Sequence, residues 1–309
     1  MRRLQIILII SITLLFMNMT SFNIYASNKF TTDAKSGIAI DEKSGQIIWE
    51  KNDKQVLSVG SISKLLSVYV VEDKMIEHHL KLSDKIVINK QEAQLSRNSL
   101  TTDIPLKDKH AYSIKDLLIR ALIKSSNASM LALANSISGN QNNFVKLMKI
   151  KAKRLGIKDV KLVNSNGLPN TKFFKNNYNV HKKNMISNKL SAEDIGIISR
   201  NLILHYPSIL SITSKSDFNL DGSDIKSTNE MLPGGNFYDK KFKVKGLKTG
   251  TTVRAGSCFV AITSIKRHNV ITVLLGTNNN DDRFEQTDRL FNYINSHYVV
   301  HHGIWKHNK

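Results

Sequence analysis

The sequence predicts an α/β (α+β) sandwich, in which an antiparallel sheet is flanked by helices and joined to a mostly helical subdomain. Strand-like segments lie near both ends of the chain, and helical segments fill the region between them. No internal repeat or long linker divides the chain, and 41% of its 309 residues are hydrophobic. The chain can therefore bury a sizeable core, as one large domain or two small ones, and we expect the two terminal segments to share one antiparallel sheet.

The first half begins with a predicted hairpin. Two apolar runs flank Glu-Lys-Ser-Gly within 36–52, which is typical of two strands and a turn. A helix that is apolar nearly all round starts at Ser61 and is therefore expected in the core. Residues 80–112 are mixed and polar, which indicates loops and short elements. Residues 113–137 have helical periodicity, and we expect a break near Ser125–Asn127.

The second half continues with helices and then strands. Residues 163–188 are rich in Asn and Lys and are expected to form a loop. The other predicted elements are helices at 142–157, 191–207 and 282–298 and strands at 242–249, 256–265 and 269–276. Residues 299–309 are expected to be a flexible tail.

The N-terminus predicts export from the cytoplasm. Arg2 and Arg3 precede an apolar run from Leu4 to Met17, and a small residue follows at Ala26. This order is typical of a secretory signal, so we assign 1–26 as a signal peptide cleaved after Ala26. An uncleaved anchor is the alternative, but the run is short for a membrane span.

The composition narrows the range of partners. A formal net charge of +20 suits an anionic partner such as nucleic acid or a wall polymer. The basic residues are spread along the chain without an aromatic-interleaved cluster, and export makes nucleic acid an improbable partner. Cys258 is the single cysteine, so no disulfide forms within the chain, and it is expected to be a packed side chain.

Ser61 and Lys64 form the first candidate catalytic pair. Residues i and i+3 of a helix lie side by side, and an ammonium in an apolar helix is costly to bury. Burial would lower the pKa of Lys64, which could then accept the proton of the Ser61 hydroxyl. The same spacing occurs at Ser223–Lys226, but that copy lies in a polar turn and is interpreted as a surface coincidence.

Two further motifs join this pair. Ser125 and Asn127 lie between apolar helical stretches, where a bend would direct a hydroxyl and an amide into a cleft. Lys248 and Thr249 follow a strand-like run and offer a fixed cation and a hydroxyl. Gly250 would allow a ligand backbone to lie close to the strand. Each motif alone is weak, since an ordinary turn would explain it.

In this order, Ser-x-x-Lys, Ser-x-Asn and Lys-Thr-Gly resemble the three motifs of the penicillin-binding protein and serine β-lactamase superfamily. The stretches SSNASMLALAN, LVNSNGLPN and VKGLKTGTTVRAGSCFVA are similar to the S11 family of D-alanyl-D-alanine carboxypeptidases, which are low-molecular-mass penicillin-binding proteins. The resemblance covers about residues 30 to 298. It implies a β-lactamase/transpeptidase-like fold, with 27–298 as the catalytic domain.

The resemblance also implies roles for these residues. Ser61 would be the acylated nucleophile, Lys64 its general base and Ser125 a proton relay to the leaving amine. Asn127 would hold the substrate amide.

The third motif would bind the substrate's end. Lys248 and Thr249 would bind the terminal carboxylate of D-Ala-D-Ala, with Gly250 alongside. The N–H groups of Ser61 and Thr251 would form an oxyanion hole. Arg283 matches a position near this carboxylate, although a helix-surface arginine is the commoner case.

The expected substrate is therefore a peptidoglycan stem peptide ending in D-Ala-D-Ala, with β-lactam antibiotics as inhibitors and no metal or organic cofactor. A D,D-endopeptidase is the main alternative, because short members of the family include such enzymes. A serine β-lactamase is less favoured, since 128–247 contains no Glu in an ExxLN pattern. A wall-binding module without activity is a third alternative, and anionic wall polymers are additional candidate partners.

Overall fold

The computed structural model describes residues 30–98, 104–158, 160–169, 186–220 and 222–308. The signal peptide predicted at 1–26 and most of the predicted loop at 163–188 lie outside these residues. The chain divides into two units, Met1–Thr31 and Thr32–Lys309, and the fold below is that of the second unit. In the described part of the chain, no helix combines the length and the apolar character that crossing a bilayer requires.

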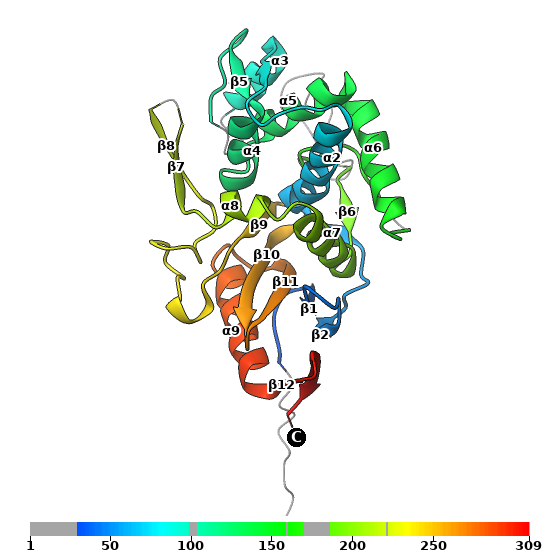
Figure 1. The fold of residues 1–309 in the computed structure, drawn as a ribbon, viewed down its shortest axis with the longest axis vertical. Coiled ribbons are helices and arrows are strands. Elements are labelled where there is room, and N and C mark those ends of the chain that lie inside the picture. Colours follow the sequence, from blue (N-terminus) through cyan, green and yellow to red (C-terminus); the bar gives the residue numbers. More distant parts are fainter. Residues whose placement is uncertain (1–29, 99–103, 159, 170–185, 221, 309) are drawn as a thin grey trace, which may run out of the picture. The chain divides into compact units, whose positions relative to one another are not determined.

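A five-stranded antiparallel sheet forms the centre of this unit, with strand order β2-β1-β11-β10-β9 (Figure 1). Strand β1 pairs with β11 from Ser36 opposite Leu275 to Asp41 opposite Val270, so the two ends of the chain share the sheet as predicted. The strands are β1 Ser36–Asp41, β2 Ile47–Lys51, β9 Leu247–Thr252, β10 Gly256–Ile265 and β11 His268–Thr277.

Helices cover both faces of the sheet. Helix α7 packs on β1 and β11, whereas α9 packs on β10 and β11 from the other side (Figure 1). Helices α3 to α6 form the predicted helical subdomain with α2. The helices are η1 Gly60–Ser63, α2 Lys64–Glu77, α3 Lys90–Ser96, α4 Ile114–Ile123, α5 Asn127–Ser138, α6 Gln141–Arg154, α7 Ala192–His205, α8 Ile209–Thr213, η4 Lys240–Phe242 and α9 Asp282–His297.

Four two-stranded sheets complete the described structure. They pair β3 Leu57–Ser58 with β6 Lys189–Leu190, β4 Lys85–Val87 with β5 Ala111–Ser113, β7 Asp217–Leu220 with β8 Ser223–Lys226, and β12 Tyr298–His301 with β13 Ile304–His307. Ser223 is exposed at the start of β8. The second Ser-x-x-Lys copy is therefore a strand of a surface hairpin, without a helix to bring its two side chains together.

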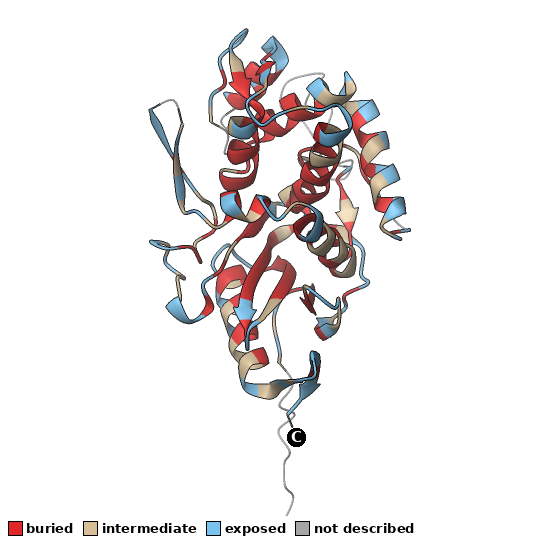
Figure 2. Cartoon of the chain, viewed as in Figure 1, coloured by how far each residue is buried: buried red, intermediate tan, exposed pale blue. Residues whose placement is uncertain are grey.

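The core lies along α2 and between the sheet and its helices. Figure 2 shows α2 and α5 as mostly buried helices, whereas α6 has a buried side and an exposed side. Leu65, Leu66, Val68 and Tyr69 are fully buried on successive positions of α2. Every residue of α2 from Lys64 to Val71 is buried, which explains why this part of the sequence lacks the polar face of a surface helix.

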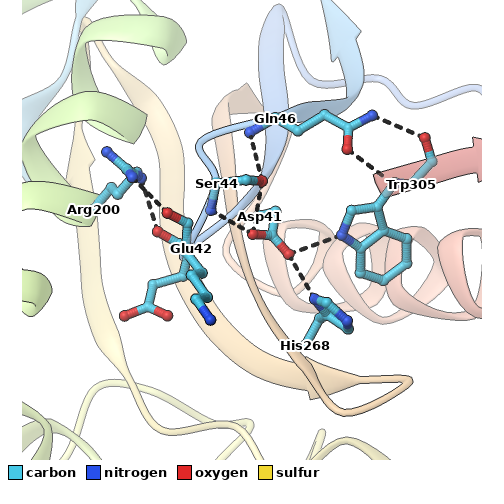
Figure 3. Close-up of polar contacts among 8 residues, drawn as sticks. Asp41, Glu42, Ser44, Gln46, Arg200, His268 and Trp305 are labelled. Carbon is cyan, nitrogen blue, oxygen red and sulfur yellow. Dashed lines mark hydrogen bonds and ion pairs between the residues drawn. The ribbon is translucent and has the colours of Figure 1, made fainter. Parts of the chain in front are cut away.

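The prediction of a flexible tail at 299–309 is wrong for the described residues. Residues 298–307 form the β12–β13 hairpin, in which the Trp305 side chain is 3% exposed. The Trp305 indole donates to Asp41 Oδ2 at 2.9 Å, and its backbone exchanges two 2.8 Å hydrogen bonds with the Gln46 amide (Figure 3). The hairpin is held by residues about 260 positions away, which local sequence patterns do not reveal.

The predicted strand at 242–249 is also displaced. Phe242 belongs to η4, and the strand begins only at Leu247. Gly246 has a φ of +136°, a conformation that favours glycine and separates the preceding segment from β9. Lys248 consequently lies inside the strand rather than at its end.

Candidate active site

The start of α2 places Lys64 beside Ser61. Ser61 lies in the 3-10 turn η1, and Lys64 is the first residue of α2 and fully buried. The Lys64 Nζ atom is 2.9 Å from Ser61 Oγ, 2.8 Å from Asn127 Oδ1 and 2.6 Å from the Asn166 carbonyl oxygen. These three oxygens compensate the burial of a polar amine. The first and second predicted motifs therefore meet at one nitrogen atom.

A short turn between α4 and α5 carries the residues of the second motif. Helix α5 starts at Asn127 and is capped by Ser126, whose Oγ accepts from the Ser129 N–H. The preceding residue, Ser125, has a φ of +65° and is 8% exposed. The break predicted near Ser125–Asn127 is thus a short turn between two buried helices, and it holds Ser125 two residues from the Asn127 amide that contacts Lys64.

The segment 164–168 closes the site behind Lys64, and the sequence analysis assigned it no role. Its Asn166 carbonyl accepts from Lys64. Gly167 has a φ of +83°, and a Cβ there would come within 2.1 Å of the Gly60 carbonyl oxygen. Asn188 Nδ2 ties the segment to η1 by donating to Ser63 Oγ at 2.8 Å and to the Asn164 carbonyl at 2.9 Å. Glycine at 167 lets this segment reach the serine-bearing turn.

Strand β9 brings the third motif against the same turn. A Cβ at Gly250 would lie 3.0 Å from the Ile62 backbone nitrogen, so η1 itself fills the space beside this glycine. Gly250 was expected to admit a ligand backbone, but in the structure it is η1 that lies against this glycine. A Cβ at Gly60 would lie 3.7 Å from the Thr251 nitrogen. Ser61 and Thr251 therefore sit on adjoining segments.

Lys248 is buried and close to two other basic side chains. Its side chain is 1% exposed, and Nζ donates to the Thr249 carbonyl at 2.9 Å. Burial lowers the pKa of Lys248 well below its ordinary value, and the nearby basic side chains of Lys64 and Arg283 lower it further. This concentration of positive groups favours an anionic ligand or a developing negative charge.

Arg283 reaches this site from α9. Its Nη1 donates to Thr251 Oγ1 at 2.8 Å, and its side chain is 7% exposed. The expectation that Arg283 more commonly lies on the helix surface is therefore wrong. Burial lowers the pKa of Arg283 to about 10, so the guanidinium remains charged at neutral pH. The apolar periodicity of α9 gave no signal that one of its polar residues faces inward.

Thr228 is another residue that the sequence did not reveal. Its Oγ1 lies 2.5 Å from Thr249 Oγ1, and its backbone N–H donates to the Ile123 carbonyl at 3.1 Å. Ile123 ends α4, just before the Ser125 corner. Thr228 therefore connects the second and third motifs, although it lies in an irregular segment without a periodic pattern.

The chemical groups present suit nucleophilic catalysis by a hydroxyl. Among the described residues, no group of three His, Cys, Asp or Glu side chains could hold a metal ion. Cys258 is fully buried, and burial raises the pKa of its thiol to about 11. The thiol is therefore protonated at neutral pH, which agrees with the expected packing role. Ser61 is the nucleophile candidate that has an amine within hydrogen-bond distance.

Comparison with known proteins agrees with this geometry. The profile of a peptidase family described as D-alanyl-D-alanine carboxypeptidase matches residues 23–279. The D-alanyl-D-alanine carboxypeptidase DacF of Bacillus subtilis (strain 168) is 26% identical over 100% of this chain and 75% of its own length. The D-alanyl-D-alanine endopeptidase of Pseudomonas aeruginosa (strain PAO1) is 27% identical over 86% of this chain and 78% of its own length.

Solved structures of penicillin-binding proteins resemble this fold. A peptidoglycan synthesis regulatory factor (PBP3) from Streptococcus pneumoniae is 38% identical, with a TM-score of 0.81 over 87% of this chain and 73% of that chain. Ampicillin-bound penicillin-binding protein D2 from Listeria monocytogenes is 25% identical, with a TM-score of 0.68 over 86% of this chain and 98% of that chain.

Proposed function

Because the chain belongs to the D-alanyl-D-alanine carboxypeptidase family of peptidases, we propose that it is a serine carboxypeptidase acting through an acyl-enzyme at Ser61. Its substrate is a peptidoglycan stem peptide that ends in D-Ala-D-Ala. The observation that carries this proposal is the position of Lys64 Nζ, within hydrogen-bond distance of Ser61 Oγ, Asn127 Oδ1 and the Asn166 carbonyl.

The hydrogen bonds of Lys64 suit a general base. A neutral amine has two N–H donors and one lone pair. The Asn127 Oδ1 and Asn166 carbonyl atoms are acceptors and take the two N–H groups. The lone pair then faces Ser61 Oγ, whose O–H donates to it. The hydroxyl transfers its proton to Lys64 as its oxygen attacks the carbonyl carbon of the penultimate D-alanine.

The tetrahedral intermediate then collapses to an acyl-enzyme. The N–H groups of Ser61 and Thr251 stabilise the oxyanion, and each such donor typically contributes about 100- to 1000-fold in rate. Ser125 relays a proton to the leaving D-alanine nitrogen as the peptide bond breaks. Water then hydrolyses the ester at Ser61, releasing the shortened stem peptide and restoring the serine hydroxyl.

The positive groups on and beside β9 bind the terminal carboxylate of the substrate. Lys248 supplies a buried amine that becomes protonated when the carboxylate binds, Thr249 a hydroxyl, and Arg283 a cation held through Thr251. Asn127 completes the surface along which the peptide lies. Recognition of a carboxylate by Lys248 and Arg283 favours a free chain end, which is what a carboxypeptidase requires.

β-Lactams are the expected inhibitors. Structures of penicillin-binding protein D2 from Listeria monocytogenes contain ampicillin or cefotaxime. In this chain, a β-lactam would acylate Ser61 and leave a slowly hydrolysed ester. Stoichiometric labelling by a fluorescent penicillin, lost in Ser61→Ala, tests the assignment of the nucleophile.

The enzyme is placed outside the cytoplasm in this proposal, because its substrate belongs to the cell wall and the sequence of 1–26 has the features of an export signal. The charge of +20 suits retention on anionic wall polymers. Release from isolated walls by moderate salt supports this retention, and binding that is independent of salt contradicts it.

Mass analysis of products from purified muropeptides tests the reaction itself. Loss of one alanine from a monomeric pentapeptide is the expected result. Cleavage of cross-linked dimers without alanine release would instead establish the endopeptidase activity for which the Pseudomonas relative is named.

A further inference from the structure

A pocket of about 560 Å³ lies beside the candidate active site and is lined almost entirely by carboxamides. Among the described residues that line it, eight of eleven are Asn or Gln, and the others are Leu131, Gly139 and Val163. None of these described residues is charged, although the chain as a whole carries +20. The chemistry of this wall suits a neutral ligand rich in oxygen atoms.

The pocket presents side-chain N–H donors because the carbonyl oxygens of the same carboxamides already accept hydrogen bonds from the backbone. Asn89 and Asn140 cap α3 and α6, and their Oδ1 atoms accept from the Glu92 and Asn143 N–H groups. Asn166 Oδ1 accepts from the Leu168 N–H. Within the described part of the chain, the three Nδ2 groups have no hydrogen-bond partner. Asn166 is only 4% exposed, so its amide is a positioned donor rather than a mobile surface group.

Gln141 provides an independent indication of a ligand. Its Oε1 accepts from the Ser165 N–H at 2.5 Å, which fixes the side chain. Its Nε2 is buried and has no hydrogen-bond partner among the described residues. Buried amide donors are almost always paired, because leaving one unpaired costs stability. An acceptor oxygen from a ligand would satisfy it after a small shift of the amide.

The pocket extends along α5 away from the catalytic serine. Asn166, which lines the pocket, accepts from Lys64 through its carbonyl oxygen. Helix α5 starts at Asn127, beside Lys64, and the pocket includes Gly139, which follows its last turn. Twelve helical residues span about 18 Å. Four residues separate the scissile bond of a stem peptide from its sugar, and when extended they span about 14 Å. The two lengths are therefore similar.

We propose that this carboxamide pocket binds the N-acetylated glycan that carries the stem peptide. Acetamido carbonyls and ring hydroxyls are neutral acceptors that match the exposed N–H donors. The volume falls in the usual range for small-molecule sites and can accept a disaccharide. The proposal rests on the proposed function for the identity of the substrate, but the pocket makes no use of the catalytic groups.

Kinetics with two substrates test the proposal. We expect the kcat/KM for a disaccharide-pentapeptide to exceed that for the free pentapeptide by about 10-fold, which two net hydrogen bonds can supply. The double variant Gln91→Leu/Asn142→Leu should reduce this ratio to near 1 without changing turnover of the free pentapeptide. Gln91 and Asn142 are exposed lining residues. Gln94→Leu is the matched control, because Gln94 is exposed on the same helix but does not line the pocket.

A titration with the peptide-free disaccharide of N-acetylglucosamine and N-acetylmuramic acid separates this proposal from the proposed function. Shifts of Asn and Gln side-chain amide resonances, lost in the double variant, support the pocket even if the protein does not release alanine. An unchanged substrate ratio in the double variant overturns the glycan assignment. The glycan assignment is also overturned if, in the Ser61→Ala protein, the free pentapeptide shifts these resonances and the disaccharide does not.

Discussion

The Lys64 Nζ atom lies 2.9 Å from the Ser61 Oγ atom, and both lie at the start of a helix whose next turns are fully buried. The distance fits direct proton transfer between the two groups. The same nitrogen also contacts Asn127, so Lys64 connects the first motif to the second.

Replacing either member of this pair should stop acylation. Ser61→Ala removes the nucleophile, and we expect no labelling by fluorescent penicillin. Lys64→Met keeps the length of a buried side chain but removes the base, so we expect acylation to slow by about 10³-fold. Stopped-flow labelling measures both rates, and thermal unfolding checks that each variant is folded. Labelled Ser61→Ala, or Lys64→Met acylated at the normal rate, would contradict the assignment.

Gly167 should matter for activity without touching the substrate. A Cβ at this position would lie 2.1 Å from the Gly60 carbonyl, so Gly167→Ala must displace the segment that carries the Asn166 carbonyl. We expect the acylation rate to fall at least about 10-fold, since Lys64 loses an acceptor that orients it. Gly156→Ala is the control, because Gly156 has a similar φ of +81° and nothing within 4 Å. Equal effects of the two substitutions would assign the loss to backbone strain alone.

Arg283 should affect substrate binding more than turnover. Arg283→Gln removes a buried cation beside Thr251, and we expect the KM for D-Ala-D-Ala peptides to rise about 10-fold with a smaller change in kcat. Arg289→Gln, an exposed position on the same helix, should leave both constants unchanged. A fall in kcat at constant KM would place Arg283 in the chemical step instead.

Glu72 should make stability depend on pH. Burial, with a smaller contribution from the charge of Asp73, raises the pKa of Glu72 to about 7 from 4.5. The folded state therefore binds the proton more tightly than the unfolded state. The stability that the folded state gains by binding this proton is fully present below pH 4.5. It is lost as the pH rises through 7, and the total loss is up to roughly 3 kcal/mol. Glu72→Gln should raise the free energy of unfolding at pH 8 and change it little at pH 4.5. Equal effects at both pH values would contradict the raised pKa.

The sequence predicted the elements that have a local signature. The hairpin at 36–52, the break at Ser125–Asn127 and the sheet shared by both chain ends are confirmed. Turn residues, caps and periodicity depend on neighbours within a few positions, so one sequence suffices to read them. The order of the three motifs along the chain also indicated the family, although each motif alone is weak.

The missed features depend on contacts between distant residues. The Asn166 carbonyl is a backbone group, so no side-chain pattern marks its contact with Lys64, 102 positions away. Arg283 faces Thr251 because of how α9 packs on the sheet. Trp305 lies in a short polar segment that is ordered only by Asp41 and Gln46. None of these partners can be paired from spacing alone.

The contact between Trp305 and Asp41 gives the last prediction. Burial alone would raise the pKa of Asp41, but hydrogen bonds from the Ser44 backbone, the Trp305 indole, the Ser44 hydroxyl and His268 hold it below its usual value (Figure 3). The stabilisation from this carboxylate is therefore present above pH 3.8 and is lost as the pH falls through its lowered pKa.

Trp305→Phe should keep most of the packing but remove the indole N–H, so we expect a loss of about 1–2 kcal/mol at pH 7. Trp305→Ala also removes a buried ring and should cost about 3–5 kcal/mol or release the hairpin. Because the chain has two tryptophans, Trp49→Phe leaves Trp305 as a fluorescent reporter of the hairpin. In that background, Asp41→Asn should shift the Trp305 emission to longer wavelength at pH 7. An unchanged emission, together with unchanged unfolding of Trp305→Phe, would show that the hairpin is held without this hydrogen bond.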